Sequence, residues 1–533
     1  MNVIIVVSVR IFSPDGHFFA QEVEIMKIAM TGVSGNMGRE ALAQSMQLEF
    51  IERVRVLLTP KRKNNKLSRR LKARYGDRIE IVRGWLSDAA ACEKLVEGAD
   101  IVVNMAAVIP PHSDKNPQAS YLCNQLGAVR LADAVAAMKN QAKLIHTSTV
   151  AVYGNRTLAH PWGRPGDPLM PAAFDYYAMH KMIGERHVME SGVKNWAVLR
   201  QTAMLYEGII FSNISDGLLF HTTLNGPLEW VTARDSGYLI RRILECEQQG
   251  KNEKFWNRVF DISGGHLNRR TGYDTFVDGF SIMGGSPRSY FKPNWCATRN
   301  FHGLWYADNE LEKMYSYQRG TVEGFWNEMS KKYRIFRLAR LVPAALIRKC
   351  VFGRLLGDDN SPSKWIKNGD EARVTAAFGS IENALSLPSD WTGFSVEDAK
   401  QYGSDESEPM QACAGRMLSH GYDESKPFEK LTLDDIREAA IFRGGRCLSK
   451  EMAETPYTKM LWQCSEGHTF SAAPYTVLKG GHWCPFCQPQ PWKYDTLAKK
   501  SPYYAQVWYD SHSADEDYIY SFDKDGNAHI ERG

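Results

Sequence analysis

The feature that most constrains the fold is a glycine-rich turn that follows a short apolar run near the start of the chain. The run 27–30 leads directly into a segment in which Gly32, Gly35 and Gly38 recur at three-residue intervals. A turn of this kind between a strand and a helix lets the backbone approach a pyrophosphate, and the helix N-terminus favours negative charge. The sequence therefore predicts a dinucleotide site built from Gly32, Ser34, Gly35, Asn36, Met37 and Gly38.

Short apolar runs alternate with amphipathic stretches through the first two hundred residues. The runs predict strands at 28–30, 54–58, 79–82, 101–105, 144–147 and 196–199. This rhythm is typical of right-handed crossover units, in which helices cover both faces of a parallel sheet. We therefore predict an α/β fold with a Rossmann-type, doubly wound parallel sheet.

The length of 533 residues is too great for a single hydrophobic core. Residues 1–25 are interpreted as an extra strand or a leader ahead of a natural start at Met26. The predicted order after that is a Rossmann domain at 26–204, a smaller substrate-binding half at 205–332, an amphipathic helical extension with a polar linker at 333–409, and a small zinc-binding α+β domain with a tail at 410–533.

Composition excludes several classes of protein. The formal charge of +4 is small for this length and both signs are well represented, so nucleic-acid binding is disfavoured. Ten cysteines are too sparse for a disulfide scaffold and suit a reducing compartment. No apolar run reaches the roughly 18 residues of a membrane span, and the start lacks the pattern of a signal peptide. We expect a cytoplasmic protein.

Further motifs follow the glycine turn in a fixed order. They are Asn104-Met105-Ala106-Ala107, then Ser148-Thr149 with Tyr153-Gly154, then Tyr177-x3-Lys181, then Leu199-Arg200. Taken together, they resemble the extended short-chain dehydrogenase/reductase superfamily, often called the NAD-dependent epimerase/dehydratase family. The resemblance covers roughly residues 26–330 and implies a nicotinamide cofactor.

Acid–base chemistry explains why a tyrosine and a lysine occur together at this spacing. A phenol with a pKa near 10 is a poor base at neutral pH, and a lysine one helical turn further along can lower that pKa. By resemblance, Tyr177 exchanges a proton with the substrate oxygen, Lys181 also holds the nicotinamide ribose, and Thr149 hydrogen-bonds the reacting group. An isolated Tyr-x3-Lys would be an ordinary surface pair, but the other motifs in order favour catalysis.

Cofactor choice is set just after the second predicted strand. Relatives that prefer NAD usually have a carboxylate there, whereas this chain has Lys61, Arg62 and Lys63. Cations would attract a 2′-phosphate, so NADP is favoured over NAD; the alternative is a solvated basic loop. The resemblance also places Leu86, Ala106 and Ala107 beside the cofactor.

Departures from the family pattern reduce the number of reactions that the chain is expected to catalyse. No acid pair follows Thr149, which disfavours a dehydratase, and no asparagine follows Arg200, which weakens a UDP-sugar epimerase. We predict reversible hydride transfer between NAD(P) and a ketone or secondary alcohol. The alternatives are a nucleotide-sugar epimerase and a dinucleotide-sensing scaffold. Aromatic residues in 205–332 suit an apolar or aromatic substrate, although core packing explains them equally well. Family members commonly dimerise, so a homodimer is compatible with the resemblance.

A second signature lies near the C-terminus. Cys464-x3-His468 and Cys484-x2-Cys487 are two close pairs of thiolate and imidazole ligands, which suit a tetrahedral structural zinc ion. The pattern resembles treble-clef or zinc-ribbon modules. Cys447 and His482 remain alternative ligands. We expect the module to contact protein, within the chain or between protomers, rather than nucleic acid.

The segment 333–357 is basic and amphipathic. We interpret it as a helix pair packed on the domain with its arginines in solvent. A helix lying on a membrane surface is the less favoured alternative.

Overall fold

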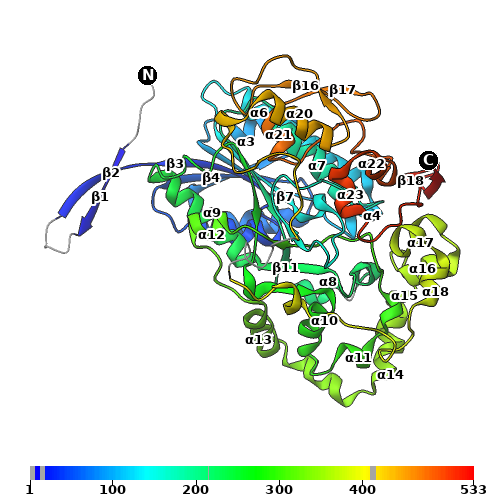
Figure 1. Cartoon of the computed structure of the whole chain (residues 1–533). Helices are drawn as coiled ribbons and strands as arrows, with labels where there is room; N and C mark the ends of the chain where they lie inside the picture. Colours follow the sequence, from blue (N-terminus) through cyan, green and yellow to red (C-terminus); the bar gives the residue numbers. More distant parts are fainter. Residues whose placement is uncertain (1–5, 13–17, 214, 408–415) are drawn as a thin grey trace.

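The structure is a computed structural model in which residues 6–12, 18–213, 215–407 and 416–533 are described (Figure 1). Its centre is a seven-stranded sheet in which every neighbouring pair is parallel. In chain order the strands are β3 (Met26–Thr31), β4 (Ile51–Leu58), β5 (Ile79–Arg83), β6 (Ile101–Asn104), β7 (Lys143–Thr149), β9 (Trp196–Gln201) and β12 (Arg258–Ile262).

The predicted fold class is confirmed, and so are the six predicted strands. The seventh strand, β12, comes from the range predicted as the substrate-binding half, because that range leaves the sheet and then returns to pair with β9. The spatial order is β5-β4-β3-β6-β7-β9-β12, so the chain changes direction across the sheet between β3 and β6. In open parallel sheets, ligands bind at such a switch point, outside the carboxyl ends of the strands.

Helices cover both faces of the sheet and enclose two apolar cores. One face carries α1 (Asn36–Ser45), α2 (Lys63–Tyr75) and α9 (Ala233–Gln248). The other face carries α3 (Ala89–Val96), α6 (Gly127–Ala136) and α7 (Tyr176–Glu190). Central strands such as β6 are buried along their whole length, as expected of strands covered on both faces.

A smaller unit covers the carboxyl ends of β7 and β9. Its sheet is β10 (Ala203–Leu205), β11 (Pro227–Thr232) and β13 (Arg269–Thr271), packed with α10 (Gly272–Ser281) and α13 (Val322–Lys332). The residues that follow form two helical stretches. The first is a 3₁₀ stretch at Arg334–Leu341, and the second is an unbroken run of α14 (Ala344–Ile347), a π segment at Arg348–Phe352 and α15 (Gly353–Leu356). The predicted helix pair at 333–357 is therefore present as two helical stretches, 334–341 and 344–356, which are separated at Pro343 because proline cannot continue a helix.

Short helices α16 (Pro362–Asn368), α17 (Glu371–Phe378) and α18 (Ile381–Ser386) come next. The polar linker predicted at the end of 333–409 reaches into residues 408–415, which lie outside the described residues. In the described part of the chain, no helix is long and apolar enough to cross a membrane.

The C-terminal module comprises residues 416–533 and is built from short elements. They are α20 (Leu433–Phe442), β15 (Arg446–Cys447), β16 (Met460–Gln463), β17 (Thr469–Ala472), α21 (Pro474–Leu478), α22 (Tyr494–Lys500), α23 (Pro502–Trp508) and the hairpin β18 (Tyr518–Phe522) with β19 (Ala528–Arg532). Figure 1 shows the module lying over α6 and α7. Met170 and Met179, from the first half of the chain, share one buried cluster with Trp462, Trp483 and Trp492 of the module. The module and the nucleotide-binding half thus have a common core, and the boundary near residue 409 stays a prediction.

At the other end of the chain, β1 (Val6–Phe12) and β2 (Phe18–Glu24) pair as an antiparallel hairpin. The prediction allowed one extra strand in this range, and the structure has two. The hairpin ends just before β3 begins at Met26.

Candidate active site

The glycine turn lies at the switch point of the sheet. Gly32 has φ +73°, and a Cβ at this position would lie 2.4 Å from the carbonyl carbon of Met105. At Gly38, a Cβ would lie 2.3 Å from the carbonyl oxygen of Gly32. Gly35 precedes α1, and no side chain caps that helix. The helix N-terminus therefore offers backbone N–H groups to an anion, and the turn fits a dinucleotide pyrophosphate. Of the other predicted residues here, Ser34 is exposed, Asn36 half-buried and Met37 buried.

A buried polar network ties the turn to the neighbouring strands. The Thr31 hydroxyl donates to Asn104 Oδ1 at 2.6 Å and accepts the backbone N–H groups of Met105 and Ala106, each at 3.1 Å. Asn104 Nδ2 lies 3.0 Å from Nδ1 of His146. Burial lowers the pKa of His146 to about 3, which keeps it neutral. The network holds Ala106 and the exposed Ala107 beside the turn, where the resemblance expects the cofactor.

The predicted basic group lies at the carboxyl end of β4. Arg62 is exposed at the start of α2, and the Lys61 ammonium lies 5.4 Å from the ring centroid of Trp85, which follows β5. Leu86 is only 6% exposed and packs close to Gly127 of α6, so it contributes to the core. Its predicted contact with the cofactor stays a prediction.

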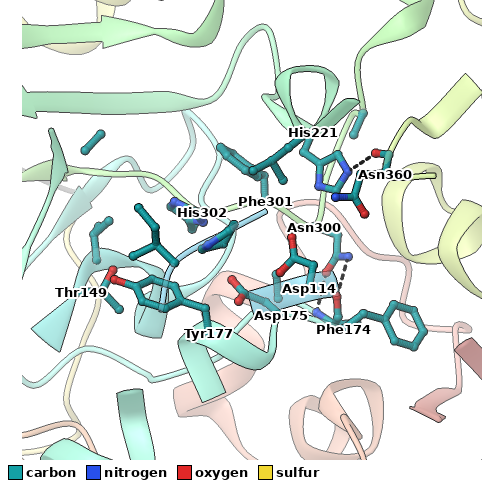
Figure 2. A pocket seen from close by; sticks show the side chains of 18 of the residues that line it. Asp114, Thr149, Phe174, Asp175, Tyr177, His221, Asn300, Phe301, His302 and Asn360 are labelled. Carbon is teal, nitrogen blue, oxygen red and sulfur yellow. Dashed lines mark hydrogen bonds between the residues drawn. The ribbon is translucent and has the colours of Figure 1, made fainter. Parts of the chain in front are cut away.

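The three predicted catalytic residues come from two elements. Thr149 ends β7, and Tyr177 and Lys181 lie one turn apart on α7. Figure 2 shows the Thr149 side chain beside the Tyr177 hydroxyl. The Lys181 ammonium is buried behind them and donates to the carbonyl oxygen of Thr147 at 2.7 Å, with that of Ala106 at 3.5 Å. Lys181 therefore lies between the carboxyl ends of β6 and β7, next to the switch point.

The pKa of Tyr177 differs from what the spacing predicts. Burial raises this pKa to about 12, while a hydrogen bond with Thr149 lowers it and the charge of Asp175 raises it. Burial also lowers the pKa of Lys181 to about 8. The expected lowering of the Tyr177 pKa is not found here, because burial dominates and the lysine is held by backbone carbonyls. Tyr177 is thus protonated at neutral pH.

Tyr177 and Thr149 line a cavity of about 350 Å³ that also contains titratable groups not predicted from the sequence. Burial and the neighbouring Asp114 charge raise the pKa of Asp175 to about 7, and burial raises that of Asp114 to about 6. Figure 2 shows these two carboxyl groups side by side. Burial lowers the pKa values of His221 and His302 to about 4. At neutral pH the cavity therefore combines neutral imidazoles with carboxyl groups that are partly protonated.

The loop that leads into α7 is held in a strained conformation. Phe174 has φ +70°, which is costly for a bulky residue. Asn300 holds the preceding residue by accepting the Ala173 N–H at 2.8 Å and donating to its carbonyl at 3.3 Å. The Phe174 ring makes edge contacts with Trp492 and Phe522 of the C-terminal module, at centroid distances of 5.7 and 5.3 Å. Asp175 then caps α7 by accepting the Ala178 N–H at 2.9 Å.

The middle of α7 is joined to the module by buried charges. Arg200 and Glu185 are both fully buried and pair at 2.6 Å. Arg200 also donates to the carbonyl oxygen of Gly480, and Glu185 lies 2.9 Å from His482. The next residue, Arg186, donates to the carbonyl oxygen of Trp483 at 2.6 Å. The module therefore contacts α7 at its beginning and along its middle.

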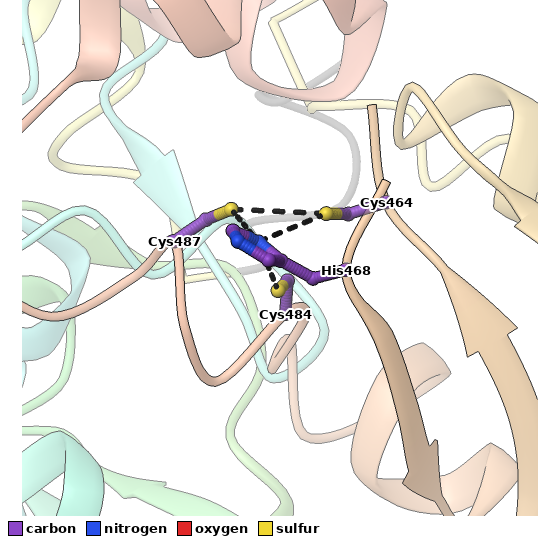
Figure 3. A group of neighbouring side chains, drawn as sticks. All are labelled: Cys464, His468, Cys484 and Cys487. Atoms are coloured by element: carbon purple, nitrogen blue, oxygen red, sulfur yellow. Dashed lines mark hydrogen bonds between the residues drawn. The ribbon is translucent and has the colours of Figure 1, made fainter. Parts of the chain in front are cut away.

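The four predicted metal ligands are brought together. Ligand atoms of Cys464, His468, Cys484 and Cys487 all lie within 4.8 Å of one another (Figure 3). His468 Nδ1 lies 3.2 to 3.7 Å from the three sulfur atoms, and the Sγ atoms of Cys464 and Cys487 are 3.8 Å apart. A zinc ion with bonds of about 2.3 Å to sulfur needs tetrahedron edges of about 3.8 Å, so the arrangement fits zinc. Neither alternative ligand belongs to the group, since His482 is engaged with Glu185 and Cys447 stands apart in β15.

Comparison with known proteins agrees with this geometry. Residues 28–200 match the model of the NAD dependent epimerase/dehydratase family. This segment is similar to that family. The matched range runs from β3 to β9 and contains the glycine turn and all three predicted catalytic residues, which confirms the resemblance to short-chain dehydrogenases/reductases for this part of the chain.

Curated relatives match a shorter stretch. The dTDP-4-dehydrorhamnose reductases of two Mycobacterium tuberculosis strains are 35% identical over 126 residues, which is 23% of this chain and 40% of each relative. The chain thus covers less than half of the length of these relatives.

Solved structures align over a longer range at low identity. The dTDP-glucose 4,6-dehydratase of Bacillus anthracis, in complex with NAD, is 17% identical with a TM-score of 0.46 and covers 58% of this chain and 97% of that protein. The UDP-Glc/GlcNAc 4-epimerase of Campylobacter jejuni is also 17% identical, with a TM-score of 0.44, and covers 58% and 99%.

Proposed function

We propose that this chain is an NAD(P)-dependent oxidoreductase that transfers hydride between the nicotinamide and a ketone or secondary alcohol. One observation supports this most strongly: Thr149 and Tyr177 line the same cavity at the carboxyl ends of β7 and β9, with Lys181 one turn behind. A scaffold that only bound dinucleotide would not require all three.

Tyr177, Thr149 and Lys181 have different roles in the proposed reduction. When bound, NAD(P)H supplies the hydride. Tyr177, protonated because burial raises its pKa to about 12, donates its proton to the carbonyl oxygen during reduction. The Thr149 hydroxyl hydrogen-bonds the same oxygen and orients the carbonyl. Lys181, near the Ala106 carbonyl, would hold the hydroxyl groups of the nicotinamide ribose.

Replacing Tyr177 by Phe tests the proposal. We expect turnover to fall by about 10²- to 10⁴-fold, while cofactor affinity stays within about twofold, because only the proton donor is lost. Tyr176→Phe is the matched control, since Tyr176 is adjacent and stacks on Phe522. Stoichiometric loss of NADPH absorbance separates an oxidoreductase from an epimerase, which would retain its cofactor. Unchanged turnover in Tyr177→Phe would contradict the proposal.

We further propose that NADP is preferred over NAD. The exposed Arg62 and the neighbouring Lys61 stand where a carboxylate would bind the ribose hydroxyls of NAD. Arg62→Glu should weaken NADPH binding by about tenfold or more and leave NADH binding nearly unchanged, because only NADP carries the 2′-phosphate. Equal loss for both cofactors in a titration would argue against this preference.

A structural zinc ion in the C-terminal module is also proposed. With four protein ligands, no coordination position stays open for water, so the ion would stabilise the fold rather than react. Purified wild-type protein should contain about one zinc per chain and Cys484→Ser much less. Cys447→Ser, a buried cysteine outside the group, should keep the metal. Equal zinc content in all three proteins would remove the assignment.

A further inference from the structure

A second, larger cavity adjoins the catalytic one. Its volume is about 550 Å³. Ala203, Met204, Tyr206, Phe301 and His302 line both cavities, so the two spaces meet along these residues. A ligand with its oxygenated end at Tyr177 can therefore extend past Met204 and Phe301 into the second space.

The lining of the second cavity suits a hydrocarbon ligand. Most of its wall is apolar, including Trp230, Phe276, Phe280, Met283 and Trp326. A nucleotide or sugar would need free polar partners in such a wall, because a buried polar group without one is costly.

Several of the polar side chains of this wall already have partners. Asp216 pairs with Lys115, and Asp278 with Arg270 at 2.7 Å. The Trp230 indole donates to Thr275 at 3.0 Å, and the hydroxyl groups of Tyr206 and Ser212 are 2.8 Å apart. The lining thus favours an apolar chain over the sugar and nucleotide groups in the names of the relatives.

One wall of this cavity is the basic segment 333–357, defined here as the basic strip. Phe336, Ala339, Ile347 and Phe352 line the cavity. Other apolar residues of the strip are strongly exposed: Ile335 is 70%, Leu338 58%, Leu341 81% and Leu346 50% exposed. A solvated packing helix would not expose so many large apolar side chains within so few residues.

The charge of the basic strip indicates which kind of surface would cover its exposed apolar side chains. The basic strip contains five arginines and one lysine and no acidic residue. Within the described residues, none of these cations takes part in an ion pair; Arg337 and Arg348, for example, donate to Ser330 Oγ and the Ser289 carbonyl. Exposed apolar side chains among unpaired cations are the composition of segments that lie on anionic membranes.

We propose that the substrate is a membrane-derived amphiphile, whose hydrocarbon part occupies the second cavity and which enters from an anionic bilayer on which the basic strip rests. The inference depends on the proposed oxidoreductase function, because it assigns the reacting oxygen to Tyr177. It takes up the less favoured sequence-based alternative, a helix on a membrane surface, while Phe336, Ala339, Ile347 and Phe352 still pack the strip against the domain.

Chain length tests the cavity without turnover. Calorimetric binding of 2-alkanones to the full-length protein should tighten by about fourfold per methylene from 2-butanone to 2-decanone. Gly279→Leu, whose Cβ direction is open except for Trp326 at 3.8 Å, should abolish this gain for the long ketones only. Val277→Leu on the exposed part of the same helix is the control. Affinity independent of chain length in the wild-type protein would overturn the proposal.

Vesicles test the source of the substrate. The wild-type protein should co-sediment with phosphatidylglycerol-containing vesicles and much less with pure phosphatidylcholine, and Leu338→Ser combined with Leu341→Ser should reduce binding by about tenfold or more. Leu385→Ser, a residue 70% exposed on α18, should bind as wild type. Absence of vesicle binding would overturn the bilayer part of the proposal. Normal oxidation of NADPH with short ketones but no gain with chain length would refute the inference and leave the oxidoreductase function standing.

Discussion

The nucleotide-binding half and the C-terminal module are stabilised in different ways, although both contact α7. The first half has a seven-stranded parallel sheet whose central strands are buried on both faces. The module has strands of two to five residues, and depends on three fully buried tryptophans, Trp462, Trp483 and Trp492, and on the Cys/His group. Strands this short contribute few ladder hydrogen bonds. Because the module shares its core with the first half and contacts α7, we expect its short strands to depend on that half and on the proposed zinc ion.

The buried pair at the contact should give the largest effect. Glu185→Gln leaves the Arg200 guanidinium buried without its anion, so the free energy of unfolding should fall by about 3–5 kcal/mol. The same change at Glu328, whose pair with Arg234 is exposed, should cost about 0–1 kcal/mol. Urea unfolding measures both. Equal losses would mean that the two halves are not joined through Arg200.

Loss of the proposed zinc ion should lower activity at the active site. Cys484→Ser should lower turnover by about tenfold, because the loop at 480–483 that contacts Glu185 and Arg186 would loosen. Hydrogen exchange of α7 amides should rise in parallel. Cys447→Ser should change neither quantity. Full activity in a zinc-depleted Cys484→Ser protein would show that the module is an independent appendage.

The aromatic contact at the beginning of α7 should have a smaller effect. Phe522→Ala removes a ring that stacks on Tyr176 at 4.7 Å and contacts Phe174 at 5.3 Å. We expect a loss of about 1–2 kcal/mol in unfolding free energy. Turnover should fall by a few fold with little change in cofactor affinity, because strained Phe174 precedes the Asp175 cap. If only the unfolding free energy changed and turnover did not, the Phe522 ring would contribute to packing alone.

The smallest effect should be a change in pH dependence. Burial raises the pKa of Asp175 to about 7, so the folded state favours its protonated form. Its contribution to stability is complete below the ordinary carboxyl range and is lost as pH rises from roughly 4 to 7. Asp175→Asn keeps the helix cap but removes this loss, so the decline in melting temperature over that range should be shallower than in wild type. Identical profiles would remove Asp175 as the titrating group.

Much of the fold and part of the site followed from local patterns. Six strands, the glycine turn and the Tyr-x3-Lys spacing are visible in sequence because each depends on neighbouring residues. Asp114 and Asp175 were missed, because their raised pKa values come from burial between segments distant in the chain. The only local signal for Asp175 was its place before a predicted helix, where aspartate is a common cap. The Tyr177 pKa was predicted in the wrong direction, since spacing shows a charge but not the desolvation that outweighs it.

The sequence alone determined the sheet and the glycine turn and singled out the proposed catalytic residues and metal ligands, because these depend on periodicity and on side chains close together along the chain. Only the tertiary structure decided that the C-terminal module supports α7, that the catalytic cavity opens into an apolar one, and that the basic strip forms its wall. Those features arise where segments hundreds of residues apart meet, as Arg200 does with Gly480, and no local pattern encodes such a contact.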